Sequence, residues 1–319
     1  MAEVDNRKHL LEVEHLKMYF PSRQGGKKIV TKAVDDVSFF VREAETFGLV
    51  GESGCGKTTT GRTIIRLYNA TSGSVKLDGR EIAGKMDKDL HEYITQNLGM
   101  IFQDPIDSLN PRMTVEEIIS EGLRVRGEKN KKVIHDKVIE VLEKVGLSEE
   151  HATRYPHEFS GGQRQRIGIA RTIITKPRLI IADEPVSALD VSIQAQVINL
   201  LNTLKRDMGL TIIFIAHDLS VVKYFSDRIG VMYNGKIVEI AKGEDLYRNP
   251  VHPYTLALLS AIPRANPNLR GKKARIAYDA SIHDYSQEQP EMIEVEPEHF
   301  VYLSKSEFQK YYLDKKQPK

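Results

Sequence analysis

The N-terminal part of the chain carries the alternation of apolar and polar positions that half-buried strands require. The alternation runs imperfectly from Leu10 to Phe20, and residues 37–41 (VSFFV) are rich in strand-forming residues. Two turn dipeptides, Asp78-Gly79 and Asn234-Gly235, each stand between strand-like segments. Such dipeptides favour the tight turns of β-hairpins. The pattern therefore predicts antiparallel strands and two hairpins.

Three continuous apolar runs differ from this alternation. They lie at 46–51 (TFGLVG), 178–185 (RLIIADEP) and 210–218 (LTIIFIAHD), and each ends in glycine or charged residues. Strands that are buried on both faces of a parallel sheet have this composition, and open α/β sheets bind ligands at the carboxyl ends of their strands. We expect three buried parallel strands with polar chemistry beginning where each one ends.

Helical spacing replaces the strand pattern between about residues 104 and 175. Val115, Ile118, Ile119 and Leu123 form one series of apolar positions three and four residues apart. This stretch predicts an inserted helical subdomain. From about residue 241 a proline-containing segment and an acidic segment follow, and we expect them to form a separate, partly ordered tail.

Composition excludes several classes of protein. The 319 residues carry 46 Lys and Arg against 44 Asp and Glu, a net charge of +2, which gives no support to nucleic-acid binding. The single cysteine excludes an intrachain disulfide and suits a reducing compartment, so we expect a cytoplasmic location. No apolar run approaches the roughly 18 residues of a spanning helix, and the N-terminus lacks the apolar core of a signal peptide.

The strongest chemical pattern is a phosphate-binding loop that follows the first buried strand. Its glycines allow successive amides to approach phosphate oxygens, and the helix after it adds the positive end of its dipole. We expect Lys57 to reach the β- and γ-phosphates and Thr58 to bind Mg²⁺. The alternative is a glycine-rich turn without function. The predicted nucleotide-binding residues here are Gly51, Glu52, Ser53, Gly54, Cys55, Gly56, Lys57, Thr58 and Thr59.

Cys55 occupies a free position of this loop and has two interpretations. It is either a tolerated small residue or a reactive thiol whose pKa is lowered by the helix terminus.

Further motifs follow in a fixed order and decide between the families that share such a loop. Residues 159–166 (FSGGQRQR) resemble the signature of the ABC (ATP-binding cassette) family, although Phe159 stands where Leu is commoner. Gln103 looks like the Q-loop glutamine, and His217 like the switch histidine. Asp183 and Glu184 look like the Walker B aspartate and the catalytic carboxylate, and the residues similar to the D-loop are Ser187, Ala188, Leu189 and Asp190.

The resemblance assigns roles to these residues. It implies that Thr58, Gln103 and Asp183 lie around Mg²⁺ and that Glu184 polarises the attacking water. His217, Gln103 and Lys57 join Glu184 in the predicted catalytic set. Because neighbouring side chains of a strand point in opposite directions, we expect the two acidic residues to do different jobs. A purely structural His217 is the alternative.

The signature has a physical logic of its own. Ser160 and two glycines precede an amphipathic helix and form a second anion-binding helix terminus. The alternative, that Ser160 merely caps a helix, explains neither glycine. In ABC proteins the signature of one subunit meets the ATP held by the other, so the resemblance implies a head-to-tail dimer. The predicted contacts to the partner's ATP are Ser160, Gly161, Gly162 and Gln163.

Two aromatic residues are candidates for stacking on adenine. Phe20 falls at the family's position for this contact, and the neighbouring Tyr19 is the second choice. Either could instead be part of a strand core.

The resemblance also predicts the architecture. It implies an α/β fold with a P-loop NTPase (RecA-like) core, an antiparallel β subdomain, an inserted helical subdomain and a C-terminal extension. The predicted boundaries are 1–103 and 176–240 for the core with its β subdomain, 104–175 for the helical subdomain with the signature, and 241–319 for the extension.

Sequence outside these motifs indicates the transported substrate. Residues 103–115 and 249–263 look like the oligopeptide and dipeptide importers, and the tail looks like an OppF-type subunit. The implied partners are an OppD-like cassette, two membrane permeases that hold the chain at the cytoplasmic face, and, indirectly, an extracellular peptide-binding protein. ATP and Mg²⁺ are the expected ligands, and Cys55 alone cannot build an iron–sulfur cluster. We expect a structural role for His252.

Alternative functions remain open at this stage. A dipeptide or nickel importer would share every catalytic residue. A non-transport soluble ABC ATPase would usually carry a coiled-coil insertion or two cassettes, and a P-loop kinase or GTPase would not need the signature followed by a histidine.

Overall fold

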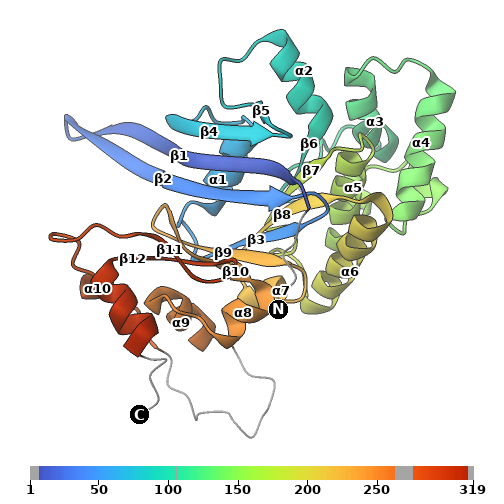
Figure 1. Cartoon of the computed structure of the whole chain (residues 1–319). Helices are drawn as coiled ribbons and strands as arrows, with labels where there is room; N and C mark the ends of the chain where they lie inside the picture. Colours follow the sequence, from blue (N-terminus) through green and yellow to red (C-terminus); the bar gives the residue numbers. More distant parts are fainter. Residues whose placement is uncertain (1–6, 105–106, 263–275, 315–319) are drawn as a thin grey trace, which may run out of the picture.

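A computed structural model describes residues 7–104, 107–262 and 276–314. Figure 1 shows two sheets lying one above the other, with helices at one end and below. The chain thus forms layers around the larger sheet, as an α/β protein does.

The smaller sheet is antiparallel and four-stranded, in the order β2-β1-β4-β5. Its predicted hairpin forms at Asp78 and Gly79, whose φ angles of 53° and 76° are those of a tight primed turn. The long β1–β2 hairpin projects from the body of the molecule (Figure 1). The strands of this sheet are β1 (His9–Gln24), β2 (Lys27–Arg42), β4 (Ser72–Leu77) and β5 (Arg80–Glu81).

The larger sheet is eight-stranded and mixed, in the order β11-β12-β10-β9-β3-β8-β7-β6. Its strands from β9 to β6 run parallel, and the strands from β11 to β9 are antiparallel. The three predicted parallel strands are therefore confirmed as β3, β7 and β8. The strands are β3 (Thr46–Val50), β6 (Leu98–Ile101), β7 (Leu179–Asp183), β8 (Thr211–Ala216), β9 (Arg228–Tyr233), β10 (Lys236–Lys242), β11 (Glu291–Glu296) and β12 (His299–Leu303).

Helices cover the larger sheet and form a cluster at one end of it. Three of them, α3, α4 and α5, lie in the predicted helical stretch and contact one another. The helices are α1 (Lys57–Ile64), α2 (Lys88–Asn97), α3 (Val115–Val125), α4 (Lys131–Lys144), α5 (Gly161–Ile173), α6 (Val191–Met208), α7 (Leu219–Val222), α8 (Gly243–Arg248), α9 (Pro253–Ser260) and α10 (Lys305–Phe308). Shorter turns are η1 (Glu149–His151), η2 (Pro156–Glu158), η4 (Ala280–Ile282) and the π-helical η5 (Gln309–Leu313).

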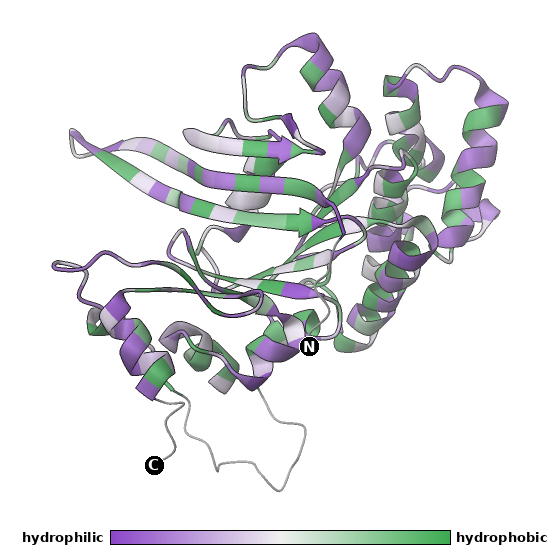
Figure 2. Cartoon of the chain, viewed as in Figure 1, coloured by the Kyte–Doolittle hydropathy of each residue, from purple (hydrophilic) through white to green (hydrophobic). Residues whose placement is uncertain are grey.

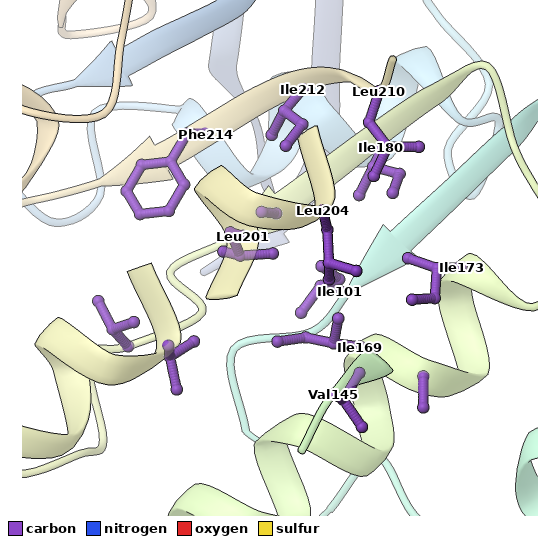
Figure 3. Close-up of a cluster of buried hydrophobic side chains, with 14 of the residues drawn as sticks. Ile101, Val145, Ile169, Ile173, Ile180, Leu201, Leu204, Leu210, Ile212 and Phe214 are labelled. Atoms are coloured by element: carbon purple, nitrogen blue, oxygen red, sulfur yellow. The ribbon is translucent and has the colours of Figure 1, made fainter. Parts of the chain in front are cut away.

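The central strands supply two cores because their side chains alternate between faces. On β8, Ile212 and Phe214 pack with the helical side, whereas Ile213 and Ile215 pack toward the antiparallel sheet. Figure 3 shows the first core, where residues of α5 and α6 meet strand residues such as Ile180. Green and purple alternate along the helices in Figure 2, as expected for helices with one buried face.

The C-terminal extension is joined to the main sheet, so the expectation of a separate tail is wrong. Strand β12 pairs with β10, and β11 extends the sheet beyond it. The buried Glu239 of β10 explains the attachment. Its carboxylate accepts hydrogen bonds from the backbone N–H groups of Val251 (2.9 Å) and His252 (3.0 Å) and contacts His299 Nε2 (2.7 Å). One carboxylate thus joins β10, β12 and the segment before α9.

No helix within the described residues is long and apolar enough to cross a membrane.

Replacing Glu239 should loosen the extension. In Glu239→Gln an amide nitrogen replaces one carboxylate oxygen, so at least one of the three groups that contact Glu239 loses its acceptor. We therefore expect the free energy of unfolding to fall by roughly 2 to 3 kcal/mol. Urea denaturation at neutral pH measures this. The control is Glu291→Gln on the exposed edge strand β11, which should change stability by less than about 0.5 kcal/mol. Equal stabilities for both variants would contradict the anchoring role.

Candidate functional site

Glycine is sterically required at two positions of the loop between β3 and α1. A Cβ on Gly51 would lie 2.1 Å from the carbonyl oxygen of Met232, and one on Gly56 would lie 2.1 Å from that of Ala33. Their φ angles of 152° and 112° also favour glycine. The loop therefore lies directly against β9 and β2, and α1 begins at Lys57 immediately after it.

Lys57 is folded back onto its own loop. Its buried ammonium group donates to the carbonyl oxygens of Gly51 (2.8 Å) and Glu52 (2.9 Å). These contacts place the charge beside the loop, where an anion would be bound.

The reactive-thiol interpretation of Cys55 is wrong. Its side chain is buried, and burial raises the pKa of the thiol despite the nearby Lys57 ammonium. A thiol with a raised pKa forms little thiolate at neutral pH. Cys55 is thus a small buried residue of the loop.

A cavity of about 380 Å³ opens at the loop. Polar groups converge on it from the loop, from the β6–α3 segment and from the ends of β7 and β8. Of the predicted nucleotide-binding residues, Gly51, Glu52 and Cys55 are not among its described lining. The lining residues are Ala33, Ser53, Gly54, Gly56, Lys57, Thr58, Thr59, Gln103, Glu184 and His217.

Asp183 is fully buried at the end of β7, next to the start of α1. Its Oδ1 accepts a hydrogen bond from the Thr58 hydroxyl (2.7 Å), and Oδ2 has no hydrogen-bond partner among the described residues. The Arg62 guanidinium lies 3.8 Å from Oδ2. Burial raises the pKa of the Asp183 carboxyl, an effect that Thr58 and Arg62 partly offset.

This pair of oxygens fits a divalent cation. Mg²⁺ usually takes one or two protein oxygens and completes its shell with water and phosphate oxygens. Thr58 Oγ1 and Asp183 Oδ2 are oxygen ligands of this kind beside the loop. A cation bound here would satisfy Oδ2, which has no hydrogen-bond partner among the described residues. No group of three or more His, Cys, Asp or Glu residues that could hold a metal by itself occurs in the described part of the chain.

Three predicted catalytic residues meet at one carboxylate oxygen. Glu184 Oε2 lies 3.0 Å from His217 Nδ1 and accepts a hydrogen bond from Gln103 Nε2 (3.2 Å). Gln103 follows β6, Glu184 follows β7 and His217 follows β8, so the parallel strands bring them together. Gln103 contacts Glu184 here, and its role near Mg²⁺ stays a prediction.

We expect strand alternation to separate the two carboxylates, and this explanation is wrong. Strand β7 ends at Asp183, and Glu184 has a φ of 44°, outside the extended region. Its amide still donates to Ile215 O of β8 (3.0 Å), and its carbonyl accepts from the Ser187 amide (3.2 Å). A turn in the left-handed region therefore aims Glu184 at the cavity, while Asp183 stays under α1.

A wider cavity of about 820 Å³ adjoins the first and shares Gln103, Glu184 and His217 with it. It reaches the D-loop residues Ser187 and Ala188. Several residues of these walls could not be predicted, because single residues outside a motif carry no distinguishing pattern. The missed residues are Ala33, Arg62, Phe102, Asp104, Asp107 and Ser108.

The signature forms the start of α5 and lines neither cavity within the described chain. Ser160 Oγ accepts from the Gln163 amide (3.3 Å), while Gln163 Oε1 accepts from the Ser160 amide (3.0 Å), which is a capping box. A Cβ on Gly162 would lie 2.5 Å from Ile193 of α6. Capping by Ser160 does not account for this glycine, but helix packing does, because the missing Cβ of Gly162 allows α5 and α6 to approach.

The candidate adenine-stacking residues lie on β1 and are not among the described residues that line the cavity. Phe20 packs edge-on against Tyr68, with ring centroids 5.5 Å apart. The Tyr19 hydroxyl donates to Asp35, and this bond raises the pKa of Tyr19 to about 12. Their contact with adenine stays a prediction. His252 caps α9 through Nδ1, in keeping with its expected structural role.

Comparison with known proteins identifies the family. Residues 34–187 match the family model described as ABC transporter, and residues 238–287 match the oligopeptide/dipeptide transporter C-terminal region. The chain is 56% identical over 301 residues to the oligopeptide transport ATP-binding protein OppF of Bacillus subtilis (strain 168), which covers 94% of this chain and 97% of that protein. The chain belongs to the ABC transporter family.

Other relatives agree with this assignment. The ABC chain is 51% identical over 303 residues to the oligopeptide transport ATP-binding protein AmiF of Streptococcus pneumoniae serotype 4, covering 95% of this chain and 97% of that protein. Among solved structures, the ABC cassette MJ0796, a dimer in a post-hydrolysis state with ADP and Pi, matches with a TM-score of 0.65 and 28% identity over 73% of this chain and 98% of that chain. The expected α/β P-loop fold is confirmed.

Replacing Asp183 distinguishes its effect on stability from its role in Mg²⁺-dependent ATP binding. Because burial raises the pKa of this carboxyl, the charged form destabilises the folded chain above that pKa, and Asp183→Asn should raise the melting temperature at pH 7. The advantage should shrink as pH falls toward 4 and wild-type Asp183 becomes protonated. Mg²⁺ should also raise the ATP affinity of the variant less than that of the wild type, by a factor of about ten or more. Calorimetric titration with and without Mg²⁺ measures this, and a less stable variant with an intact Mg²⁺ effect would contradict it.

Proposed function

We propose that this chain is the ATP-binding and ATP-hydrolysing subunit that powers oligopeptide import through an ABC transporter. The meeting of Gln103, Glu184 and His217 at one carboxylate oxygen, beside the phosphate-binding loop, carries the proposal. Its support from relatives is that OppF of Bacillus subtilis and AmiF of Streptococcus pneumoniae, at 56% and 51% identity, are oligopeptide transport ATP-binding proteins.

Placement and charge neutralisation account for most of phosphoryl-transfer catalysis. The amides of the loop and Lys57 hold the phosphates of ATP, and Phe20 or Tyr19 stacks on adenine. Thr58 and Asp183 would hold Mg²⁺, with Gln103 near its shell, and the bound ion would supply charge neutralisation at the phosphates. Glu184 polarises the attacking water, and His217 keeps the carboxylate oriented toward it through Oε2.

The site is completed by a second cassette in this proposal. Ser160, Gly161, Gly162 and Gln163 are not among the described lining of the two cavities beside the loop, and Ser160 and Gly161 are exposed, so their contact with ATP held by a partner is part of the proposal. We propose a head-to-tail heterodimer with an OppD-like cassette, in which the D-loop, residues 187–190, lies near the shared interface. Dimers are known for the MJ0796 cassette.

The dimer acts with membrane proteins. Two permease subunits hold it at the cytoplasmic face of the membrane, and an extracellular peptide-binding protein delivers the substrate. A dipeptide or nickel importer is the alternative within the same subfamily, and a soluble ABC ATPase outside transport is a more distant one. Uptake of labelled peptides of graded length and of nickel by the assembled transporter distinguishes these functions.

Glu184→Gln tests the proposed hydrolysis directly. The amide cannot act as the base, so turnover in the assembled transporter should fall on the order of 10²- to 10⁴-fold while ATP still binds. Phosphate release and equilibrium ATP binding are the two measurements. Glu244→Gln on α8 is the matched control, because that carboxylate is 80% exposed and should leave both unchanged. Near-normal turnover in Glu184→Gln would remove Glu184 from the mechanism.

Ser160→Ala tests the composite site. ATP binding by the isolated chain should stay unchanged, whereas turnover of the assembled pair should fall by about tenfold, as expected for losing one hydrogen bond to a charged group. Ser304→Ala removes an equivalent capping-box serine from α10 and controls for loss of a cap. Equal turnover in the two variants would argue that Ser160 is only a cap.

A further inference from the structure

One side chain of the C-terminal extension reaches the phosphate-binding loop. The hydroxyl of Tyr254, in the first turn of α9, accepts a hydrogen bond from the backbone N–H of Glu52 (3.1 Å). The Tyr254 side chain is fully buried, at 1% exposure. Two segments about 200 positions apart in sequence are thus joined at the nucleotide site.

The short sequence His252-Pro253-Tyr254 fixes this contact. The His252 amide is held by Glu239, and Nδ1 of the same histidine accepts the Tyr254 N–H (3.1 Å). Burial, together with the neighbouring His283, lowers the pKa of His252 to about 3, so its ring stays neutral and Nδ1 remains an acceptor at neutral pH. Pro253 starts the helix without needing an N–H partner.

Neighbouring rings hold the tyrosine side chain in place. Tyr254 lies 4.4 Å from Tyr233 and 5.2 Å from Tyr278, measured between ring centroids, and those two rings are 5.1 Å apart in an edge-to-face arrangement. Tyr233 is the last residue of β9, and Tyr278 comes from the extension. Packed aromatic rings have few alternative rotamers, so the hydroxyl keeps its position.

The contact controls one peptide group of the loop. The Glu52 N–H belongs to the Gly51–Glu52 peptide group, and the Gly51 carbonyl of that group accepts from Lys57 Nζ (2.8 Å), so both the N–H and the C=O of this peptide are used. Glu52 does not line the cavity, whereas Ser53 and Gly54 just after it do. The orientation of the Gly51–Glu52 peptide therefore affects how the chain enters Ser53 and Gly54 on the cavity wall.

We propose that Tyr254 is a positioning residue of the nucleotide site and that the extension orders the phosphate-binding loop through its hydroxyl. The inference rests on the proposed ATP binding by this loop. With the Gly51–Glu52 peptide fixed, the loop is ordered before ATP arrives, and less conformational freedom is lost on binding. Glu184 and His217, which follow β7 and β8, contact each other and have no hydrogen bond to Tyr254 within the described residues.

Tyr254→Phe tests the proposal by removing a single oxygen. The ring and its packing remain, but the Glu52 N–H loses its acceptor. The full-length chain should bind ATP about 3- to 10-fold more weakly by calorimetric titration, the loss expected for one hydrogen bond. In the assembled transporter KM for ATP should rise by the same factor with kcat unchanged, and backbone amide exchange in residues 51–56 should become faster.

Tyr278→Phe is the matched control, because it removes a hydroxyl from the same cluster of rings without touching the loop. It should leave ATP affinity and KM as in wild type. Unchanged affinity and exchange in Tyr254→Phe would overturn the inference, as would equal weakening in both variants or a fall of kcat in proportion to affinity. If the wild-type chain itself failed to bind ATP, the proposed function would fail instead.

Discussion

The close approach of the phosphate-binding loop to two neighbouring backbones governs the rest of the structure. Gly51 and Gly56 lie so near the carbonyl oxygens of Met232 and Ala33 that no Cβ fits. The turn after β9 completes the contact, because the Gly235 amide donates to Cys55 O (2.9 Å) and the Gly235 carbonyl accepts from the Asp35 amide (2.8 Å). The loop thereby joins the antiparallel sheet to the larger sheet. Its shape is fixed by contacts with the backbones of β2, β9 and the turn after β9.

The chemistry of the site follows from the larger sheet. Side chains on successive parallel strands reach the same edge, so the ends of β6, β7 and β8 bring an amide, two carboxylates and an imidazole together. Strands buried on both faces hold these ends rigidly, because each face packs into its own core. On the other side of β3, β9 and β10 carry the extension, and Glu239 ties it to the sheet. The extension is therefore well placed to influence the loop, which Tyr254 of α9 contacts.

Much of this could be predicted from the sequence, for identifiable reasons. The apolar runs ending at Val50, Asp183 and Ala216 are long and nearly free of polar residues, so few structures other than buried strands suit them. The motif residues occur in a fixed order and spacing, and this order singles out Gln103, Glu184 and His217. The turns at Asp78 and Asn234 needed only local chemistry.

Other features depend on tertiary contacts that have no local pattern. The pairing of β12 with β10 brings Glu239 into contact with His299, 60 residues away. Gly162 is needed partly because α5 and α6 pack closely there. This need depends on Ile193 of α6, which is distant from the signature in sequence. The Glu184 amide bonds to Ile215 of β8 while its φ is left-handed, so strand periodicity gave the wrong explanation for the different positions of Asp183 and Glu184.

The central claim is that ATP is hydrolysed at a site shared between two cassettes. The most direct measurement is the rate of ATP turnover per subunit for this chain as a strict monomer, compared with the rate after titration of the partner cassette. The account predicts that the monomer binds ATP but hydrolyses it very slowly and that turnover rises to saturation as pairs form. Full turnover by the monomer, unaffected by the partner, would contradict it.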